Sequence, residues 1–494
     1  MIWVLALACV VAAVPAGLRW LRVAQREHYL PSVTRFAFRW WANGPINLVL
    51  ITLAVVGVIG AWFYVGLGLL VVFSQVGPVG LSVKGRTSPL SWTARLRRVA
   101  IVSGVIFLIV IAGGVVVYSA AVVVGALLLL PLIIDLALLI LAPIEARMGN
   151  KWVEKAGQRL RESGARVVAI TGSYGKTTTK EYLHHLIGDE VRSVASPASF
   201  NNRMGLARAI NERLVPGTDV FIAEMGTYGR GEISELCAWL NPEVSAIVSI
   251  GPVHLERFRT EENIVAAKAE ILDGARLGVL AIDHPLLAVL AEQRSREMEI
   301  VTVGSSPADI VVDLTTRRLS RGISALGVIP DDVFATNLAV AVGIAGGLGI
   351  EVDPARFATL PRAEHRQSES LGSGGFLIID DTFNSNPAGA ERALNRLVEV
   401  AAQNKRVLVT PGMVELGPLQ DEANSEFARR AAAVCDHIFI VGRTNRSSLL
   451  RGSDRGSASV TVVAEREDAV DWVRENLTAG DAVLYENDLP DHYP

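Results

Sequence analysis

The chain has 494 residues, enough for about three domains of ordinary size. Its formal net charge of −3 gives no indication of nucleic-acid binding, and its three cysteines are too far apart in the sequence for a disulfide framework or a zinc site. Most of the long runs of Val, Leu and Ile lie within residues 1–143, and ordinary globular sequence follows from about residue 150. We therefore expect a membrane part followed by a soluble part.

The N-terminal part, residues 1–145, is predicted to be a helical transmembrane domain. An α-helix needs roughly 20 apolar residues to cross a hydrocarbon core about 30 Å thick. The first apolar stretch has no basic segment before it and no convincing cleavage site after it, so we interpret it as an anchor rather than a signal peptide. The candidate spans are Ile2–Leu18, Ile46–Val76, Val99–Tyr118 and Ala121–Leu141.

Basic residues in two loops predict the orientation of this domain, because loops rich in Lys and Arg stay in the cytoplasm. The stretch between the loops must then leave and return, so Ile46–Leu81 is predicted to form two short spans bent near Gly60–Gly66. This gives about five helices, an external N-terminus and a cytoplasmic location for everything after Pro143. Four spans would place a basic loop or the remaining chain outside. The basic residues are Arg19, Arg22, Arg26, Arg35 and Arg39 in the first loop, and Lys84, Arg86, Arg95, Arg97 and Arg98 in the second.

A glycine-rich turn follows the last apolar stretch by about 25 residues. The apolar run before the turn is typical of a buried strand, and the helix after it is predicted to start at Lys180. Such a turn binds phosphate, because its N–H groups converge on the anion at a helix N-terminus, while Lys176 adds a charge and Thr177 a hydroxyl for Mg²⁺. Two residues separate Gly172 from Gly175, rather than the usual four, which indicates a narrower family. The expected phosphate-binding residues are Gly172, Ser173, Gly175, Lys176, Thr177 and Thr178.

In the soluble part, β-rich runs alternate with helical patterns, which predicts an α/β fold with a parallel sheet. Glu224 follows the predicted strand Val220–Ala223, and His254 comes shortly after the predicted strand Val244–Ile250. Because the carboxyl ends of parallel strands line the ligand crevice, both side chains are candidates for a site. Lys268, on the next predicted helix, is a third candidate. Taken singly, the three are equally compatible with a loop carboxylate, a helix N-terminal residue and a solvated lysine.

Together with the phosphate-binding turn, these residues lie in five ordered motifs that resemble the middle domain of the Mur ligases. The likeness is greatest to the MurF type, which adds D-alanyl-D-alanine to a muramoyl peptide, and it extends from about residue 150 to about residue 475. The resemblance implies a Mur ligase ATP-binding domain over residues 150–362 and a Rossmann-like C-terminal domain over residues 363–494. The motifs are Thr171–Thr178, Asn201–Gly205, Ala223–Gly226 with Gly231–Ile233, His254–Phe258 and Lys268–Ile271.

The resemblance also implies roles for single residues. Lys176 would hold the ATP phosphates, and Lys268 would be carbamylated, because a carbamate is an anion that helps to hold Mg²⁺ whereas an ammonium repels it. The expected metal-binding residues are Thr177 and Glu224 on one ion and His254 on a second, with Lys268 beside them. The expected catalytic residues are Lys176, Glu224, His254 and Lys268. Besides the turn, the nucleotide is expected to contact Asn337, Arg366, Asp381 and Asn384, and the substrate to contact Asn201, Asn202 and Arg203.

The sequence departs from the family pattern at both ends. MurF-type enzymes start with a soluble domain that grips the UDP sugar, whereas this chain has apolar stretches there, so the acceptor need not be a UDP sugar. The last domain takes the incoming amine in the family, and its departures leave the identity of the amine open. The departures are His365 in place of the hinge glycine, Gly412 in place of Asp, Asn424 in place of a common His, and Tyr485–Pro490 in place of a Lys-Gly-Ser stretch.

By this resemblance we expect an ATP-dependent amide ligase of cell-envelope synthesis, with ATP and Mg²⁺ as cofactors. The acceptor carboxylate would become an acyl phosphate, which an amine then attacks. The expected partners are a free or lipid-linked muramoyl peptide, an amino acid or dipeptide that supplies the amine, and the bacterial cytoplasmic membrane. No nucleic acid is expected, and the oligomeric state is left open.

Two alternatives remain open at this point. The same chemistry could act on another envelope polymer or a polyglutamate-type acceptor, or the chain could be a membrane ATPase, a transporter or a non-catalytic scaffold. The joint presence of the four expected catalytic residues argues against a scaffold, and the scarcity of charges in the apolar stretches argues against a transport path. The basic loops either set only the topology or also bind anionic lipid head groups.

Overall fold

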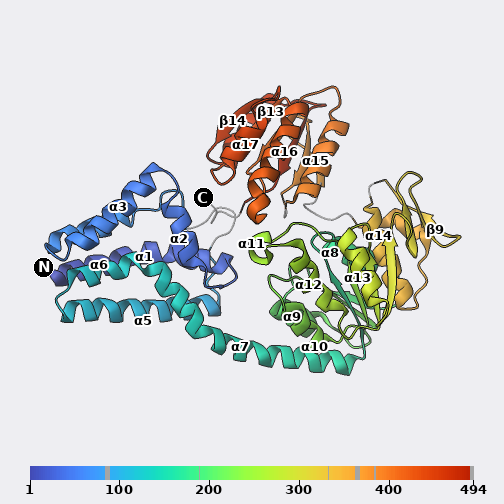
Figure 1. Ribbon diagram of the computed structural model, residues 1–494, viewed down its shortest axis with the longest axis horizontal. Coiled ribbons are helices and arrows are strands. Elements are labelled where there is room, and N and C mark those ends of the chain that lie inside the picture. The colour runs from blue at the N-terminus through green and yellow to red at the C-terminus, as the bar shows by residue number, and fades with distance from the viewer. Residues whose placement is uncertain (84–89, 189, 332, 362–367, 383–384, 490–494) are drawn as a thin grey trace. The chain divides into compact units, whose positions relative to one another are not determined.

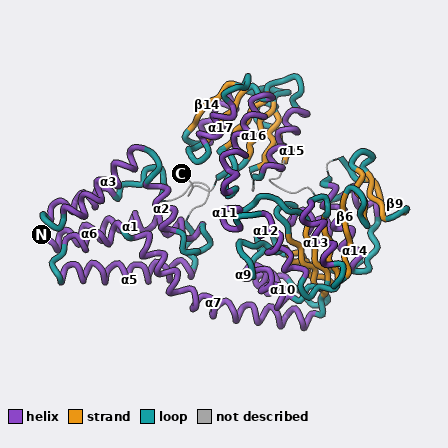
Figure 2. Tube along the Cα trace, viewed as in Figure 1, coloured by secondary structure: helices purple, strands orange, loops and turns teal. Residues whose placement is uncertain are grey.

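The computed structural model describes residues 1–494 apart from 84–89, 189, 332, 362–367, 383–384 and 490–494. Two compact units follow one another along the chain: Met1–Met148 makes up most of the first, and Gly149–Val441 with Asn445–Asp488 makes up the second. The first unit is helical, whereas the second contains both strands and helices (Figures 1 and 2). This confirms the predicted fold class of a helical segment followed by α/β domains.

The helices of the first unit pack around one apolar core, in which Cys9, Phe36, Val71, Leu96 and Val124 are fully buried. Many apolar side chains on the outer faces of the same helices are exposed, as expected of a protein surrounded by lipid. The elements are α1 (Ile2–Arg26), α2 (Val33–Trp41), α3 (Pro45–Gly60), the 3₁₀ turn η1 (Val65–Gly68), α4 (Leu69–Ser74), α5 (Ala94–Val116), α6 (Ala120–Leu128) and α7 (Leu130–Ser163).

Two of these helices, α1 and α5, are each long and apolar enough to cross a membrane. Two more spans are possible by length and composition if each bent pair counts as one: α2 with α3, bent by 112°, and α6 with α7, bent by 69°. The described residues therefore support two to four spans, fewer than the five predicted. The difference lies in the return segment, because η1 and α4 have only 4 and 6 residues and together extend less than about 20 Å.

Hydrogen bonds join the two ends of the segment from α3 to α4. The side chain of Asn47, in the first turn of α3, accepts a hydrogen bond from the N–H of Val79 (2.7 Å) and donates one to its carbonyl (3.3 Å), which joins the two ends of the segment. Arg19 of α1 donates to the carbonyls of Gln75 (2.9 Å) and Gly77 (3.0 Å), just after α4. A re-entrant hairpin and a pair of spans both satisfy these contacts.

The first sheet of the second unit has nine strands in the order β2-β3-β1-β4-β5-β6-β7-β8-β9. Strands β2 to β7 run parallel, and β8 and β9 are antiparallel additions at one edge. Strand β1 lies between β3 and β4, with Ile170 level with Glu224 and Val168 level with Val244. The chain goes to one side of β1 and later returns to the other, and a parallel sheet opens its ligand crevice at such a point. The strands are β1 (Arg166–Thr171), β2 (Ser193–Ala195), β3 (Val220–Glu224), β4 (Val244–Ile247), β5 (Leu277–Ala281), β6 (Glu299–Gly304), β7 (Ile310–Asp313), β8 (Arg318–Arg321) and β9 (Ser324–Val328).

Helices cover both faces of this sheet, since its central parallel strands are apolar on both sides. Helices α8 and α14 pack against one face through a core that includes Ile170, Leu183 and Leu338. Helices α9, α10, α12 and α13 cover the other face with the end of α7, which contributes Val153 and Leu160. The helices are α8 (Lys176–Ile187), α9 (Arg203–Arg213), α10 (Glu232–Leu240), α11 (Leu255–Phe258), α12 (Glu261–Ala269), α13 (Pro285–Arg294) and α14 (Ala335–Gly347), with 3₁₀ turns η2 (Glu270–Leu272) and η3 (Pro354–Thr359).

The second sheet has six strands in the order β10-β11-β15-β12-β13-β14, and all neighbours run parallel except β10 and β11. Helices α15, α16 and α17 contribute to the core on one face, and α18 covers the other. This is the Rossmann-like arrangement expected for the C-terminal part. Its elements are β10 (Ser368–Leu371), β11 (Leu377–Asp381), α15 (Pro387–Val400), β12 (Arg406–Thr410), η4 (Gly417–Leu419), α16 (Gln420–Val434), β13 (His437–Val441), α17 (Arg446–Ser453), β14 (Ser459–Val463), α18 (Arg466–Asn476) and β15 (Ala482–Glu486).

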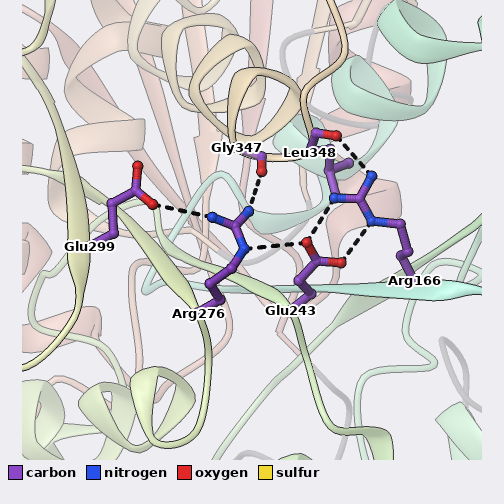
Figure 3. A network of polar contacts seen from close by, with 6 residues as sticks. All are labelled: Arg166, Glu243, Arg276, Glu299, Gly347 and Leu348. Atoms are coloured by element: carbon purple, nitrogen blue, oxygen red, sulfur yellow. Dashed lines mark hydrogen bonds and ion pairs between the residues drawn. The ribbon is translucent and has the colours of Figure 1, made fainter.

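A network of charged side chains lies at the edge of the first sheet where its parallel strands begin (Figure 3). Glu243, just before β4, accepts two hydrogen bonds from Arg166 (both 2.7 Å) and one from Arg276 (3.4 Å). Arg166 also donates to the carbonyl of Leu348 (2.8 Å), and Arg276 to that of Gly347 (2.5 Å). Because the last carbonyls of a helix have no partner within it, these arginines cap the C-terminus of α14. The network lies at the edge opposite the phosphate-binding turn, so it belongs to the scaffold.

Candidate functional site

The phosphate-binding turn lies between β1 and α8, as predicted, but the helix starts earlier than expected. Helix α8 begins at Lys176 rather than at Lys180. Gly175 precedes it with a φ of +75°, a left-handed conformation that glycine adopts without the penalty of a Cβ. The early start places Lys176 and Thr177 in the first helical turn, where free backbone N–H groups attract an anion.

Hydrogen bonds fasten the turn to the residues that follow β4. The N–H of Ser173 donates to the carbonyl of Ser249 (2.9 Å), and the N–H of Tyr174 donates to the Ser249 hydroxyl (2.8 Å). The Ser173 hydroxyl accepts from the N–H of Gly251 (3.0 Å). A side chain at Gly172 would crowd this contact, because a Cβ there would lie 3.2 Å from the Ser249 nitrogen. The turn is therefore held in shape by the neighbouring strand before any ligand arrives.

Two polar side chains lie on the turn itself. Lys176 donates from Nζ to the carbonyl of Gly172 (2.7 Å), so its ammonium lies over the turn where a phosphate is expected. Asn337 of α14, expected to contact adenine, donates from Nδ2 to the carbonyl of Gly175 (3.0 Å) and to Oγ1 of Thr179 (2.9 Å). A Cβ at position 175 would lie 2.2 Å from this nitrogen. Asn337 thus ties α14 to the turn, and glycine at position 175 makes that contact possible.

Glu224, the last residue of β3, is the buried carboxylate of the site. Its Oε2 accepts hydrogen bonds from Oγ1 of Thr177 (3.0 Å) and Nζ of Lys180 (3.2 Å), and its Oε1 lies 3.5 Å from Nδ2 of Asn201. Burial opposes ionisation, but the charges of Lys180 and Lys176 and the hydrogen bonds from Thr177 and Lys180 outweigh it and lower the pKa of Glu224. The carboxylate is therefore charged at neutral pH, and two expected metal ligands lie side by side.

Lys268 lies on α12 and is only 4% exposed. Burial, followed by the nearby charge of Lys176, holds the pKa of Lys268 well below its usual range. Among the residues that the structure describes, no carboxylate forms an ion pair with it. Both effects disfavour the protonated amine, and the unprotonated amine is the form of lysine that reacts with carbon dioxide.

His254, the expected ligand of a second metal ion, has a different partner. Its Nδ1 pairs with the carboxylate of Glu415, and its ring packs edge-on against Tyr228 with 4.9 Å between ring centroids. Within the described ranges, no three His, Cys, Asp or Glu side chains form a group that could hold a metal ion. Mg²⁺ commonly binds through one or two carboxylates together with phosphate oxygens and waters, so Thr177 and Glu224 fit that ion if a nucleotide supplies the rest.

The three residues expected to bind the substrate lie at the start of α9. Asn202 is the N-cap of this helix, and its side-chain oxygen accepts from the N–H of Gly205 (3.0 Å). Arg203 donates to the side chain of Asn150 in α7 (2.7 Å), whereas Asn201 reaches toward the site carboxylate. Of the three, only Asn201 faces the site directly, while Asn202 shapes the helix and Arg203 joins it to α7.

A cavity of about 540 Å³ opens beside the turn. Its volume suits a nucleotide, since small-molecule sites measure roughly 300–1,000 Å³. Asp381, at the end of β11 and expected to contact the nucleotide, is among the residues that line it. Arg366 and Asn384, the other two nucleotide contacts expected from the last domain, lie outside the described residues. The lining includes Ser173, Tyr174, Lys176, Asp283, Arg317, Phe334, Asn337, Asp381, Asn386 and Arg392.

Three positions at which the last domain departs from the family pattern, Gly412, Asn424 and Asn487, lie together at the carboxyl edge of its sheet. Gly412 has a φ of +77°, and a Cβ there would lie 2.4 Å from Oδ1 of Asn424. The buried Asn424 accepts from the N–H of Met413 (2.8 Å) and donates to its carbonyl (2.9 Å), and Asn487 donates to the carbonyl of Gly412 (2.6 Å). The departures at 412 and 424 are therefore coupled, because the glycine makes room for the asparagine.

Glu486 lies at the same sheet edge and is fully buried. It accepts hydrogen bonds from Oγ1 of Thr410 (2.5 Å) and from the hydroxyl of Ser385. Burial raises the pKa of Glu486 to about 7, although the hydrogen bonds from Ser385 and Thr410 oppose the rise. This carboxyl can therefore hold or release a proton near neutral pH.

Two residues of the site were not predicted. Lys180 was expected only as the first residue of the helix, yet it is fully buried against Glu224. Its spacing of three residues from Thr177, which puts both on one helix face, is the signal that could have revealed it. Ser249 was assigned to the strand, but β4 ends at Ile247 and Ser249 fastens the turn instead.

Both domains of the second unit have relatives among known protein families. Residues 170–343 match the Mur ligase middle domain, and residues 362–485 match the Mur ligase, glutamate ligase domain. The chain is 28% identical over 345 residues to the UDP-N-acetylmuramoyl-tripeptide–D-alanyl-D-alanine ligase of Bacillus subtilis, which covers 66% of this chain and 74% of the relative. The family matches begin at residue 170, after the first unit.

Solved structures resemble the same part of the chain. MurF of Thermotoga maritima in complex with ADP has a TM-score of 0.60 at 24% identity, covering 69% of this chain and 80% of that one. FolC of Escherichia coli in complex with DHPP and ADP has a TM-score of 0.52 at 18% identity, covering 69% and 91%. At these identities the two likenesses show the fold alone.

Proposed function

Because this chain belongs to the Mur ligase family, of which it carries the middle and C-terminal domains, we propose that it is a membrane-bound, MurF-like ligase that extends the peptide of a lipid-linked muramoyl acceptor. It is an ATP-dependent carbon–nitrogen ligase with ATP and Mg²⁺ as cofactors. The observation that carries the proposal is the cluster of Lys176, Thr177 and Glu224 at the opening of the crevice.

The chemistry proceeds in two displacements. The acceptor carboxylate attacks the γ-phosphate of ATP, so that ADP leaves and an acyl phosphate forms; an amine then attacks the acyl carbon, phosphate leaves, and an amide results. The N–H groups of the turn and Lys176 are placed to offset charge on the transferring phosphoryl group. Mg²⁺ held by Thr177 and Glu224 would act as a Lewis acid on phosphate oxygens.

Lys268 contributes as a carbamate in this proposal. In its unprotonated form, the amine of Lys268 reacts with carbon dioxide and releases a proton. The product is a carbamate, so an anion replaces an uncharged group. The neighbouring charge of Lys176 favours this product, because it attracts the carbamate anion, whereas it repels an ammonium at the same position.

Few residues separate the last apolar turns of the first unit from the candidate substrate-binding residues, which supports a lipid-linked acceptor. Ile144 lies in the last apolar turns of the first unit, and Asn150, which contacts Arg203, lies six positions further along the chain. Six residues span at most about 22 Å whatever the arrangement of the two units. A peptide carried by a membrane lipid can therefore reach Asn201, which lies at the start of the same helix.

The surface near this contact has the composition of a membrane interface. Trp152 of α7 and Met204 of α9 are exposed, and Lys155 lies over the Trp152 ring at 6.0 Å from its centroid. Aromatic and basic side chains are enriched where a protein meets lipid head groups. In the proposed topology, α1 enters the cytoplasm, the α3–α4 hairpin returns to the side of Arg19, α5 leaves, and the bent pair α6 and α7 enters again.

An assay with two forms of acceptor tests the proposal. Membranes with the full-length protein are incubated with ATP, Mg²⁺, D-alanyl-D-alanine and a muramoyl tripeptide that is either UDP-linked or lipid-linked. Mass spectrometry should detect the amide adduct, with the lipid-linked acceptor preferred by about tenfold or more because it shares the membrane. The Lys176→Ala variant should form no amide adduct. An adduct on the UDP-linked form alone would contradict the claim that the acceptor is lipid-linked. The absence of an adduct on both forms would contradict the whole proposal.

A second candidate is the same ligase with another amine or envelope polymer. The coupled departures at Gly412 and Asn424 favour it, since they lie in the domain that takes the amine in the family. The same assay with a mixture of amino acids that includes glutamate, in place of D-alanyl-D-alanine, tests this candidate. An adduct formed with one of these amino acids and not with D-alanyl-D-alanine would support it. Substrate flux into vesicles without any amide product would instead indicate a transporter.

A further inference from the structure

Lys180 is among the largest fully buried side chains of the molecule. Its Nζ lies 3.2 Å from Oε2 of Glu224 and 3.4 Å from Oε1 of Glu181. The Glu181 side chain is 41% exposed, whereas that of Glu224 is 4% exposed. Because water screens the exposed partner, the ion pair with Glu224 is the stronger of the two. A buried lysine therefore lies beside the candidate metal site.

Lys180 and Thr177 approach the same oxygen of Glu224. Thr177 donates to Oε2 from 3.0 Å, and Lys180 donates to it from 3.2 Å. The two donors are three residues apart on α8 and so share one face of the helix. The other oxygen, Oε1, lies on the side of Asn201. The carboxylate is thus held through Oε2 by the two shorter hydrogen bonds, whereas Oε1 accepts the longer one from Asn201 (3.5 Å), which makes Oε1 the oxygen more available to a ligand.

We propose that Lys180 is a positioning residue of the ligase: it holds Oε2 of Glu224 so that the carboxylate presents Oε1 to the metal ion. The inference rests on the proposed function for the metal and the reaction. Thr177 alone cannot serve this purpose in the same way, because its hydroxyl is also an expected ligand of that metal. Groups that orient a metal-binding carboxylate typically change metal affinity or activity by about 10- to 100-fold.

Lys180→Met tests the clamp, since it removes the ammonium and keeps an apolar stem. In the full-length protein in detergent micelles, Mn²⁺ binding in the presence of ADP, followed by electron paramagnetic resonance, should weaken by about tenfold or more. The kcat should fall by a similar factor, while ADP binding in EDTA should change by less than about threefold, because the turn and Lys176 are intact. If Lys180 were only a positive charge near the metal, its loss would tighten Mn²⁺ binding instead.

Two further variants make the test specific. Glu181→Gln removes the exposed partner and keeps the clamp, so Mn²⁺ affinity and kcat should stay within about twofold of the parent. Lys180→Gln keeps a hydrogen-bond donor without the charge and serves if the methionine variant does not fold; it should still weaken Mn²⁺ binding by about threefold or more.

The outcomes separate this inference from the proposed function. Unchanged or tighter Mn²⁺ binding in a folded Lys180 variant overturns the positioning role, and so does a parent protein that binds no Mn²⁺ with ADP. The Mn²⁺ measurement needs no acceptor, so a failed ligation assay contradicts the proposed function while the role of Lys180 is still measured.

Discussion

Glycine at position 175 meets two requirements of the phosphate-binding turn at once. Its φ of +75° lies in the left-handed region, and its missing side chain admits the amide of Asn337. Either requirement alone would favour glycine, but only the second links the turn to α14. The turn therefore depends on a residue that lies far away in the sequence.

Replacement of this glycine by alanine separates the two requirements. Gly175→Ala should cost about 1–2 kcal/mol of folding free energy through backbone strain, and more through the displacement of Asn337. Gly274→Ala is the matched control, because Gly274 has a φ of +82° and nothing within 4 Å of its missing Cβ. Thermal unfolding and the KM for ATP measure both effects. Equal losses in the two variants would show that the contact with Asn337 contributes nothing.

The carbamate at Lys268 can be examined by chemical rescue. Lys268→Ala should lose most of its ligase activity, because it removes the anion proposed beside Mg²⁺. Short carboxylates such as acetate should restore part of the activity by filling the vacated space. Lys176→Ala serves as a control that carboxylates should not rescue, since it lacks a cation. Activity of Lys268→Ala that no carboxylate restores would count against the carbamate.

Among the elements, helix α14 is fastened at both ends by side chains from other parts of the fold. Near its start, Asn337 binds the phosphate-binding turn, and at its end Arg166 and Arg276 bind the last carbonyls. Cations at a helix C-terminus also favour the helix dipole. Helix α14 therefore spans the sheet from the ligand edge to the scaffold edge, with Glu243 holding both arginines in place (Figure 3).

We expect the free energy of unfolding to depend on pH through the charge of Glu243. Hydrogen bonds from Arg166 lower the pKa of Glu243, and the charges of Arg166 and Arg276 add to this against partial burial. Because the folded-state pKa lies below that of the unfolded chain, the stabilisation is present above about pH 4.5 and is lost as the pH falls through the folded-state pKa. Since the Arg166 side chain is 39% exposed, solvent limits the effect of Glu243→Gln to about 1 kcal/mol at pH 7.

Thermal unfolding of the parent and Glu243→Gln between pH 7 and pH 3 measures this contribution. The difference in melting temperature should narrow below about pH 4.5, as the parent carboxylate takes up its proton. The exposed Glu475→Gln provides a control that should change the melting temperature little at any pH. A difference between parent and Glu243→Gln that is constant over this range would contradict the argument.

For the whole molecule, the path of the chain through the membrane decides where the ligase domains lie. The contacts of Asn47 with Val79 and of Arg19 with Gly77 bring the ends of the α3–α4 segment together. In the proposed topology both basic loops then lie on one side, whether that segment crosses the bilayer or only enters it. The count of spans thus matters less to the location of the second unit than the return of this hairpin.

Reporter fusions check this topology. Alkaline phosphatase fused after Tyr118, between α5 and α6, should be active, because the enzyme works only outside the cytoplasm. The same reporter fused after Ser82, beyond the hairpin, should be inactive, and a fusion after Gly60 distinguishes a crossing hairpin, which gives activity, from a re-entrant one. Activity after Ser82 would place a basic loop outside and refute the topology.

From the sequence alone, the strand, turn and helix around the site and the candidate residues for its chemistry could be predicted. Local pattern and backbone preference suffice to predict the strand before the turn and the strand that ends at Glu224, because each depends on residues a few positions apart. The same holds for the turn, which the spacing of Gly172 and Gly175 indicates. The family motifs added the roles of Lys176, Thr177 and Lys268 as hypotheses.

Only the tertiary structure decided which side chains meet across the sheet. Lys180 reaches Glu224 across 44 positions, Asn337 reaches Gly175 across 162, and Asn47 reaches Val79 across 32. Such contacts follow from the order of the strands and from the faces that the helices cover, and neither is written in the pattern of neighbouring residues. For this reason the residues of the phosphate-binding turn could be predicted from the sequence, whereas the contacts of Lys180 with Glu224 and of Asn47 with Val79 could not.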